Sequence, residues 1–133
     1  MRILIAEDDQ TCSLILESML KPYGSTLVVE DGEAVIRTVT SDLVKQQPFD
    51  LICLDIMMPG LDGQACLRCI RAIEYGFGRI GGVGAKILMT TGLDAPEAIM
   101  NAFRGQCEGY LVKPIERSRL HAQLSQLGYH PHQ

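Results

Sequence analysis

The sequence predicts an α/β fold in which a parallel sheet of five strands is covered by five helices. Short apolar segments alternate with amphipathic ones along the whole chain. Strict alternation requires crossover connections, which make the strands parallel and place helices on both faces of the sheet. The chain has 133 residues, 47% of them hydrophobic and 21% charged, which suits one soluble domain with a continuous core.

The first half of the chain supplies three strands and three helices. In order, the expected elements are strand Arg2–Ala6, helix Gln10–Leu20, strand Thr26–Val29, helix Glu33–Val44, strand Phe49–Leu54 and helix Gln64–Ile73. The strands are short apolar or β-branched runs, and the helices repeat apolar residues at intervals of three and four. Pro22 and Gly24 end the first helix. We expect Asp9 to begin the first helix and Asp62 to cap the third, because acids suit a helix start.

The second half continues the same alternation. Its expected elements are strand Lys86–Thr91, helix Pro96–Arg104, strand Tyr110–Val112 and helix Glu116–Leu127. The preceding glycine-rich run, residues 75–85, is longer than the usual connection from helix to strand. Two interpretations of this run stay open: a loop that contacts a partner protein, and a neutral insertion. Its Gly76–Gly81 stretch fits G-x-G-x-x-G, but a dinucleotide fingerprint follows a strand and opens a helix. This stretch has the reverse order, so we expect no dinucleotide site.

Composition excludes several classes of protein. The formal net charge of −4 argues against a general nucleic-acid surface. No apolar run is long enough to cross a membrane, and Ile3–Ala6 is too short for a signal-peptide core, so we expect a cytoplasmic protein. Five cysteines, an odd number, favour free thiols. Cys66 and Cys69 form a C-x-x-C inside a helix without a second pair, so no redox or zinc pair is expected. We expect His121, His130 and His132 to be exposed, without a partner for a metal site.

Polar residues stand at the carboxyl ends of four strands, where parallel sheets bind their ligands. The first strand runs into Glu7 and Asp8, the third into Asp55, the fourth ends at Thr91, and the fifth runs into Lys113. The three carboxylates would repel one another unless a hard cation neutralised them. Carboxylates with room for water suit Mg²⁺, with Mn²⁺ as the alternative.

This combination of groups suits the acceptance of a phosphoryl group. Such transfer is mostly a matter of positioning and charge neutralisation, and an aspartate can act as the covalent nucleophile. We therefore interpret Asp55 as the attacked residue. Lys113 supplies a compact positive charge, and the hydroxyl of Thr91 can donate to a phosphoryl oxygen.

Four ordered motifs resemble a known family. "ILIAEDD", "LICLDIMMPGLDG", "ILMTTG" and "GYLVKPI" look like the receiver domain of two-component response regulators. The resemblance implies a flavodoxin-like, doubly wound sheet in the order 2-1-3-4-5. It also implies that Asp55 is the phosphoacceptor and that Asp8, Asp55 and the backbone carbonyl of Met57 ligate Mg²⁺, with Glu7 acting mainly through water.

The same resemblance assigns roles to residues on the last two strands. It implies that Thr91 contacts the phosphoryl group, that Lys113 pairs with it, and that the Lys113–Pro114 peptide is cis. Tyr110 would be the switch aromatic, turning inward as Thr91 moves toward the phosphate. In the family, the residues two beyond the phosphoacceptor and two beyond the hydroxyl residue flank the approach of water. Here they are Met57 and Leu93, both apolar, so we predict slow self-dephosphorylation, unless these side chains only pack against a partner.

The expected organisation is a receiver domain over residues 1–128 and a short tail over 129–133, with no output domain. Such a chain would take its phosphoryl group from a histidine kinase or phosphotransfer protein. It would then signal to an unknown protein target by docking, through the fourth helix, fifth strand and fifth helix, or by phosphorelay. It would not be an enzyme, apart from assisting its own phosphorylation and dephosphorylation. One alternative is a degenerate receiver that only binds partners. The other, an aspartyl-phosphate hydrolase, is disfavoured because Met57 replaces the second aspartate expected there.

Overall fold

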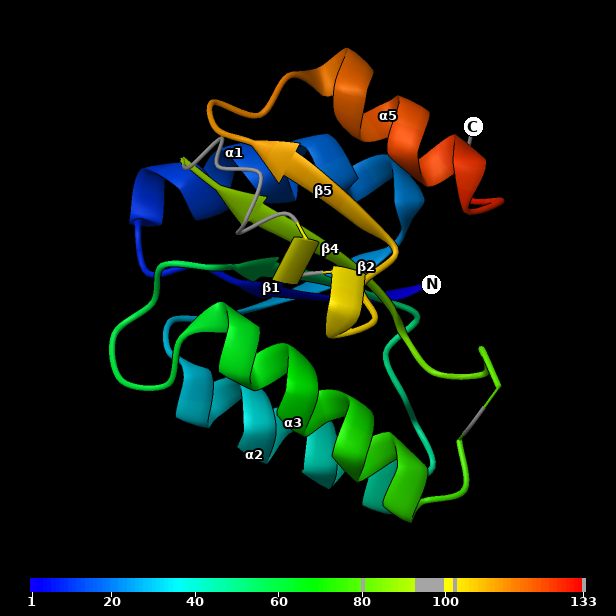
Figure 1. Ribbon diagram of the computed structural model, residues 1–133. Helices are drawn as coiled ribbons and strands as arrows, with labels where there is room; N and C mark the ends of the chain where they lie inside the picture. Colours follow the sequence, from blue (N-terminus) through cyan, green and yellow to red (C-terminus); the bar gives the residue numbers. More distant parts are fainter. Residues whose placement is uncertain (80, 93–99, 102, 133) are drawn as a thin grey trace.

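The computed structural model describes residues 1–79, 81–92, 100–101 and 103–132. Within these residues, five parallel strands form one sheet in the order β2-β1-β3-β4-β5 (Figure 1). The strands are β1 Arg2–Ala6, β2 Ser25–Val29, β3 Leu51–Asp55, β4 Lys86–Thr91 and β5 Gly109–Val112. Both the α/β class and the strand order expected from the sequence are confirmed.

Helices cover both faces of this sheet. They are α1 Gln10–Leu20, α2 Gly32–Val44, α3 Gly63–Gly76 and α5 Arg117–Gln126, with a short 3-10 helix, η1, at Lys21–Tyr23. Figure 1 shows α1 and α5 on one face and α2 and α3 on the other. Of the predicted helix Pro96–Arg104, residues 96–99 and 102 lie outside the described residues, and the remaining four are helical. None of the helices in the described part of the chain has the length and apolar character of a membrane span.

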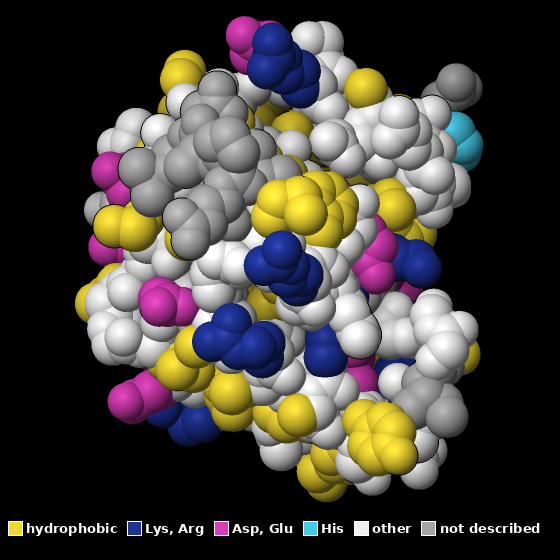
Figure 2. All heavy atoms as spheres, in the orientation of Figure 1, with side chains coloured by type: hydrophobic (Ala, Val, Ile, Leu, Met, Phe, Trp, Pro, Cys, Tyr) yellow, Lys and Arg dark blue, Asp and Glu magenta, His cyan; other side chains and the backbone are white. Residues whose placement is uncertain are grey.

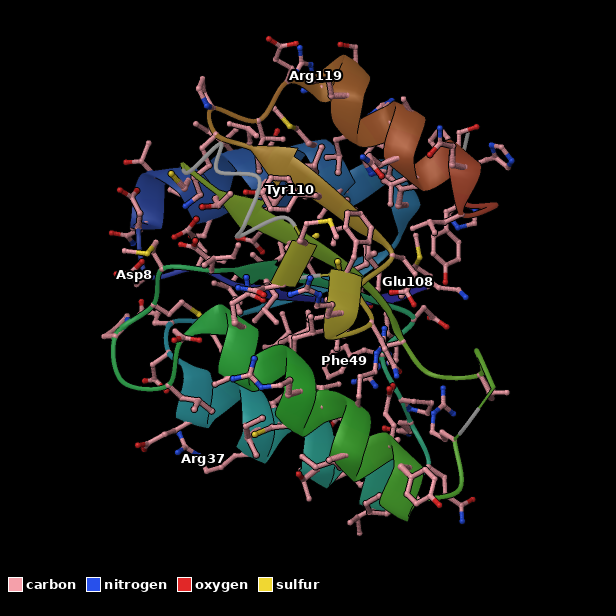
Figure 3. The ribbon with its side chains drawn as sticks, viewed as in Figure 1. Asp8, Arg37, Phe49, Glu108, Tyr110 and Arg119 are labelled. Atoms are coloured by element: carbon pink, nitrogen blue, oxygen red, sulfur yellow. The ribbon has the colours of Figure 1, made fainter. Side chains whose placement is uncertain are left out.

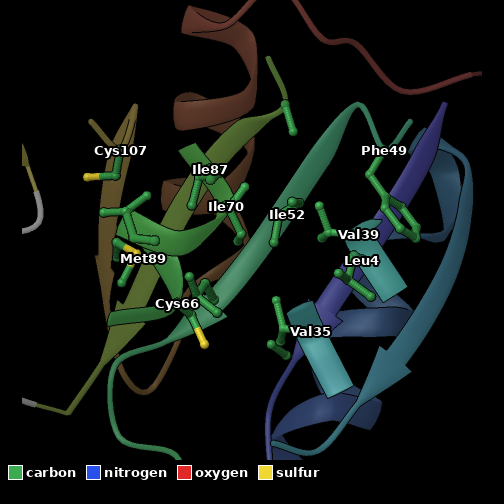
Figure 4. Packing of buried hydrophobic residues seen from close by; sticks show 14 of the residues in the cluster. Leu4, Val35, Val39, Phe49, Ile52, Cys66, Ile70, Ile87, Met89 and Cys107 are labelled. Atoms are coloured by element: carbon green, nitrogen blue, oxygen red, sulfur yellow. The ribbon is translucent and has the colours of Figure 1, made fainter. Parts of the chain in front are cut away.

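The sheet separates two hydrophobic cores. Because side chains alternate along a strand, each strand contributes to both. Leu4 and Ile52 face α2 and α3, where they pack with Val39 and Ile70 (Figure 4). Their neighbours in sequence point to the other face. That second core comprises Ile3, Ile5, Leu16, Leu20, Tyr23, Leu51, Cys53, Leu88, Leu111, Leu120 and Leu124. Strands buried on both faces explain the continuous apolar runs in the sequence.

Three aspartates begin the helices that follow β1, β2 and β3. The side chain of Asp9 accepts a hydrogen bond from the backbone N–H of Cys12 at 3.0 Å. The side chain of Asp62 accepts from the N–H of Ala65 at 2.9 Å. At the start of α2, the side chain of Asp31 accepts from the N–H of Ala34 at 2.8 Å. Each side chain satisfies a backbone donor that the first helical turn leaves unpaired. The predictions for Asp9 and Asp62 are confirmed.

The C-terminal region is more closely packed than expected. His121 was predicted to be exposed, which is wrong: it is half-buried, and its ring meets Tyr23 edge-on with 5.4 Å between centroids. The reason is that α5 lies over the aromatic residue of η1, a contact distant in sequence. His130 and His132 are exposed, as predicted. The segment after α5 lies against the protein, because the hydroxyl of Tyr129 donates to the carbonyl of Asp50 at 3.2 Å.

The cysteines are free thiols, as predicted. Cys66 and Cys69 both lie on α3, the first buried and the second half-buried. The Gly76–Gly81 stretch begins at the last residue of α3 and precedes β4, although Ile80 within it lies outside the described residues. It therefore has the helix-to-strand order that excludes a dinucleotide fingerprint.

Candidate functional site at the carboxyl edge of the sheet

The parallel register brings the predicted polar residues to one edge. Ala6 pairs with Leu54 and Thr91 with Val112, so the residues that follow these positions, Glu7, Asp55 and Lys113 among them, lie at the same edge. Hydrogen bonds between backbones hold the first residues beyond the strands. The N–H of Glu7 donates to Val29 at 3.0 Å, and the N–H of Lys113 donates to the carbonyl of Thr91 at 2.7 Å. Figure 3 shows Asp8 at this edge and Glu108 at the opposite one.

One ammonium group pairs with two buried carboxylates at this edge. The Nζ of Lys113 donates to Oδ2 of Asp55 at 3.0 Å and also to Oε1 of Glu7. Asp55 is 2% exposed and Glu7 is 4% exposed, whereas the side chain of Lys113 is 22% exposed. The cation therefore reaches the acids from the solvent side, and the acids lie within the protein.

The electrostatics follow from this burial. Burial raises the pKa of Glu7, and the neighbouring carboxylate of Asp55 raises it further, although the hydrogen bond from Lys113 acts in the opposite direction. Burial alone would lower the pKa of Lys113. The hydrogen bonds and charges of Glu7 and Asp55 outweigh that effect and raise the pKa. Lys113 therefore stays an ammonium at neutral pH.

Backbone donors fix the remaining oxygens of the two buried carboxylates. Oδ1 of Asp55 accepts from the N–H of Met57 at 3.0 Å, and Oε2 of Glu7 accepts from the N–H of Asp9 at 3.2 Å. Gly63 allows α3 to begin close to Asp55, because a Cβ at this position would lie 2.2 Å from the carbonyl oxygen of Asp55. The role of Gly63 was missed from the sequence. Its only signal is its place directly after the cap Asp62.

The donor set fits a hard divalent cation. Glu7, Asp8 and Asp55 can each place a carboxylate oxygen within 4.8 Å of the other two. Oxygen ligands of this kind are those that Mg²⁺ prefers. Three carboxylates share the single ammonium of Lys113, so two negative charges are not compensated among these groups. Asp8 is exposed and faces solvent, where an ion could enter with its own water molecules.

The two predicted switch residues lie on neighbouring strands. Thr91 is fully buried at the end of β4. Tyr110 is half-buried on β5, and its side chain packs against the core between the sheet and the helices α2 and α3. The predicted cis peptide Lys113–Pro114 is present. The side chain of Met57 is 62% exposed beside the site. Leu93, the other predicted lifetime residue, lies outside the described residues.

Comparison with known proteins agrees with this arrangement. Residues 3–125 match the family model of the response regulator receiver domain. The chain belongs to this family. Among curated proteins, the receiver is similar to the cell cycle transcriptional regulator CtrA of Caulobacter vibrioides, with 28% identity over 93% of this chain and 48% of CtrA. It is also similar to the transcription factor SKN7 of Candida albicans, with 30% identity over 92% of this chain and 20% of SKN7. The receiver thus spans less than half the length of these relatives.

Solved structures show the same fold. The receiver domain of the histidine kinase CKI1 from Arabidopsis thaliana, complexed with Mg²⁺ and BeF₃⁻, has a TM-score of 0.76 and 25% identity, over 95% of this chain and 83% of that one. A chain of the CheX–CheY–BeF₃–Mg complex from Borrelia burgdorferi has a TM-score of 0.80 and 20% identity, over 96% of this chain and 88% of that one. The flavodoxin-like architecture expected from the motifs is therefore confirmed.

Proposed function

We propose that this chain acts as the receiver of a response regulator and accepts a phosphoryl group on Asp55. The donor is a histidine kinase or a phosphotransfer protein, and the signal passes on by phosphorylation-dependent docking or by phosphorelay in the cytoplasm. The observation that carries the proposal is the position of Asp55. Its carboxylate pairs with the ammonium of Lys113 and lies beside two further acids, at the edge where a parallel sheet binds ligands.

The transfer is a displacement at phosphorus. A carboxylate oxygen of Asp55 attacks the phosphorus of a phosphohistidine, the P–N bond breaks, and its electron pair stays on the imidazole nitrogen of the donor. The product is an acyl phosphate on Asp55. The N–H of Met57 keeps the Asp55 carboxylate in place through its hydrogen bond at 3.0 Å. Lys113, an ammonium at neutral pH, then has a phosphoryl oxygen to pair with as well as a carboxylate.

Glu7, Asp8, Asp55 and the carbonyl of Met57 would hold Mg²⁺, or Mn²⁺ in its place, with Glu7 acting through water. The fit rests on the carboxylate oxygens and on their uncompensated charge. When bound, the cation would supply neutralisation of the phosphoryl oxygens and of these acids. The hydroxyl of Thr91 donates to a phosphoryl oxygen in this proposal, and Tyr110 responds by turning inward.

The proposed docking face comprises β5, α5 and the helical residues 100–104 as far as they are described. A hollow of about 240 Å³ lies along β5 and α5 and is bordered by Tyr110, Arg119 and Gln123. Figure 2 shows hydrophobic and basic side chains next to each other on the face of the molecule that is viewed there. A surface of this kind suits a protein target, and no nucleic acid or membrane is part of the proposal.

The decisive experiment is phosphorylation by a small donor. We expect acetyl phosphate with Mg²⁺ to add one phosphoryl group, stable in acid and labile in base, as measured by intact mass. The Asp55→Asn variant should take up none, because an amide of nearly the same shape is a poor nucleophile. Glu30→Gln, a change at an exposed acid, is the matched control and should be modified normally. Uptake by the folded Asp55→Asn variant would refute the assignment, and no uptake by the parent would indicate a degenerate receiver.

A further inference from the structure

A second polar hollow lies at the opposite edge of the sheet, at the amino ends of β4 and β5. It has a volume of about 290 Å³. The last turns of α3, the glycine-rich run and the segment before β5 surround it. Its lining includes Arg71, Glu74, Tyr75, Arg79, Gln106 and Glu108. Figure 3 labels Glu108 at this edge, far across the sheet from Asp8.

One wall of the hollow is a closed network around Arg71, that is, a set of hydrogen bonds in which every N–H donor of Arg71 has an acceptor. The Nε and Nη2 of Arg71 donate to the carbonyl of Gln106 at 3.0 and 2.8 Å. Nη1 donates to Oε1 of Glu74 at 2.7 Å and to the carbonyl of Ala85 at 2.8 Å. Nη2 also donates to Oε2 of Glu108 at 2.9 Å. A guanidinium has five N–H donors, so Arg71 has none left for a ligand.

The glycine-rich run is shaped around the same network. The N–H of Ala85 donates to Oε2 of Glu74 at 2.7 Å, and Glu74 is buried. A Cβ on Gly84 would lie 2.4 Å from Oε1 of Glu74, so a larger residue here would require the Glu74 carboxylate to shift. Gly81 and Gly82 adopt left-handed φ values of 67° and 84°. These turns and contacts set the course of residues 81–85 beside Glu74, and this segment borders the hollow.

Arg79 differs from Arg71 in having a donor to spare. Its Nη2 donates to the carbonyl of Val83 at 2.8 Å, but its Nε is buried and has no hydrogen-bond partner among the described residues. Both acids of the hollow are already paired with Arg71. A buried charged donor without an acceptor is unfavourable. Arg79 as a whole is half-buried and lines the hollow.

We propose that this hollow binds an anionic small molecule, with its carboxylate or phosphate group on Arg79. Guanidinium groups bind such oxyanions through directed, charge-assisted hydrogen bonds. The ring of Tyr75, which is 72% exposed, offers an apolar surface for the body of the molecule. The site is separate from the phosphoacceptor site and needs neither phosphorylation nor a metal.

Nuclear magnetic resonance of the arginine side chains tests the proposal on the unphosphorylated protein without Mg²⁺. We expect benzoate, phenyl phosphate or inorganic phosphate to shift the Nε–Hε resonance of Arg79 saturably. Arg79→Lys keeps the charge without this donor, and it should bind about ten-fold more weakly or worse, as followed by the amide resonances of Gly81 and Gly82. Arg117→Gln, at an exposed arginine of α5, is the matched control and should bind like the parent.

The outcomes separate the sources of the oxyanion. Saturation by benzoate assigns the site to carboxylates, and saturation by the two phosphates assigns it to phosphoryl compounds. Shifts that rise linearly without saturation, or that appear equally at Arg117, would overturn the proposal. Unchanged binding by an Arg79→Gln variant with the amide spectrum of a folded protein would also overturn it. Because no phosphorylation is involved, none of these results depends on the function proposed for Asp55.

Discussion

Replacing Lys113 by Met should destabilise the metal-free protein at neutral pH. The change leaves the carboxylates of Glu7 and Asp55, which are 4% and 2% exposed, without the ammonium that pairs with both. Removing one partner of a buried ion pair costs about 3–5 kcal/mol. Since the side chain of Lys113 is 22% exposed, water screens the pair in part. We therefore expect the free energy of unfolding to fall by an amount near the lower end of this range, about 3 kcal/mol.

The assay is urea unfolding at neutral pH, with a chelator and then with Mg²⁺. The metal should recover more stability in Lys113→Met than in the parent, because it neutralises the acids that the variant leaves unpaired. Lys45→Met, at an exposed lysine, is the matched control and should change the free energy of unfolding by less than about 0.5 kcal/mol.

The loss in free energy of unfolding caused by Lys113→Met should also depend on pH, in a direction that the titration of Glu7 determines. Burial raises the folded-state pKa of Glu7 above its ordinary value of 4.5, and losing Lys113 removes an interaction that lowers it. A group with a raised folded pKa contributes stability below its unfolded pKa, and this stability is lost as pH rises through the folded pKa. The penalty should therefore shrink as pH falls from 7 toward 4.5. A loss under about 1 kcal/mol in chelator, or one that does not change with pH, would refute the reasoning.

Three further predictions concern the metal, the thiols and the phosphate lifetime. Asp8→Asn should weaken Mg²⁺ binding, and so reduce the Mg²⁺-induced rise in Tm, and should leave the metal-free Tm equal or higher, since one repulsion is removed; an unchanged metal-induced shift would exclude Asp8 as a ligand. Burial raises the pKa of Cys53 to about 12 and that of Cys66 and Cys107 to about 11, and these three thiols are shielded from solvent. Burial also raises the pKa of Cys12, but Cys12 and Cys69 are only half-buried. Iodoacetamide near neutral pH should therefore modify only Cys12 and Cys69 of the folded protein, as peptide mass spectrometry would show. The double variant Met57→Asn, Leu93→Glu should release phosphate about ten-fold faster than the parent, because polar groups can orient the attacking water; equal rates would contradict the prediction.

The sequence predicted that these polar side chains meet at one edge, because their positions depend on local order along the chain. Parallel strands send their carboxyl ends to one edge, so Glu7, Asp55 and Lys113 had to lie near one another once the alternation was recognised. Asp9 and Asp62 were also predictable, because a cap acts on a donor three residues away. The strand order came from the family resemblance and not from periodicity, which does not determine the order of strands.

Contacts between distant segments could not be predicted in this way. The edge-on contact of His121 with Tyr23 depends on how α5 lies over η1, and periodicity carries no information about that angle. The contact of Tyr129 with Asp50 joins residues 79 positions apart. The need for glycine at position 63 arises from one carbonyl oxygen of β3. In each case the pattern along the chain is the same with or without the contact.

The two edges of the sheet show that residue types alone do not identify a site. Each edge holds a basic side chain placed between two acids: Lys113 with Glu7 and Asp55, and Arg71 with Glu74 and Glu108. At the amino edge, all five donors of Arg71 have acceptors, and that group can only stabilise the fold.

At the carboxyl edge, the exposed carboxylate of Asp8 adds to those of Glu7 and Asp55, so three carboxylates lie beside the one ammonium of Lys113 and two negative charges stay uncompensated among these groups. An unbalanced cluster gains by binding a cation, and a closed network does not. The same comparison separates Arg79 from Arg71, since Arg79, unlike Arg71, keeps a buried donor without an acceptor among the described residues. The donors, acceptors and charges that the fold leaves unsatisfied therefore distinguish a binding site from a network that only stabilises the fold.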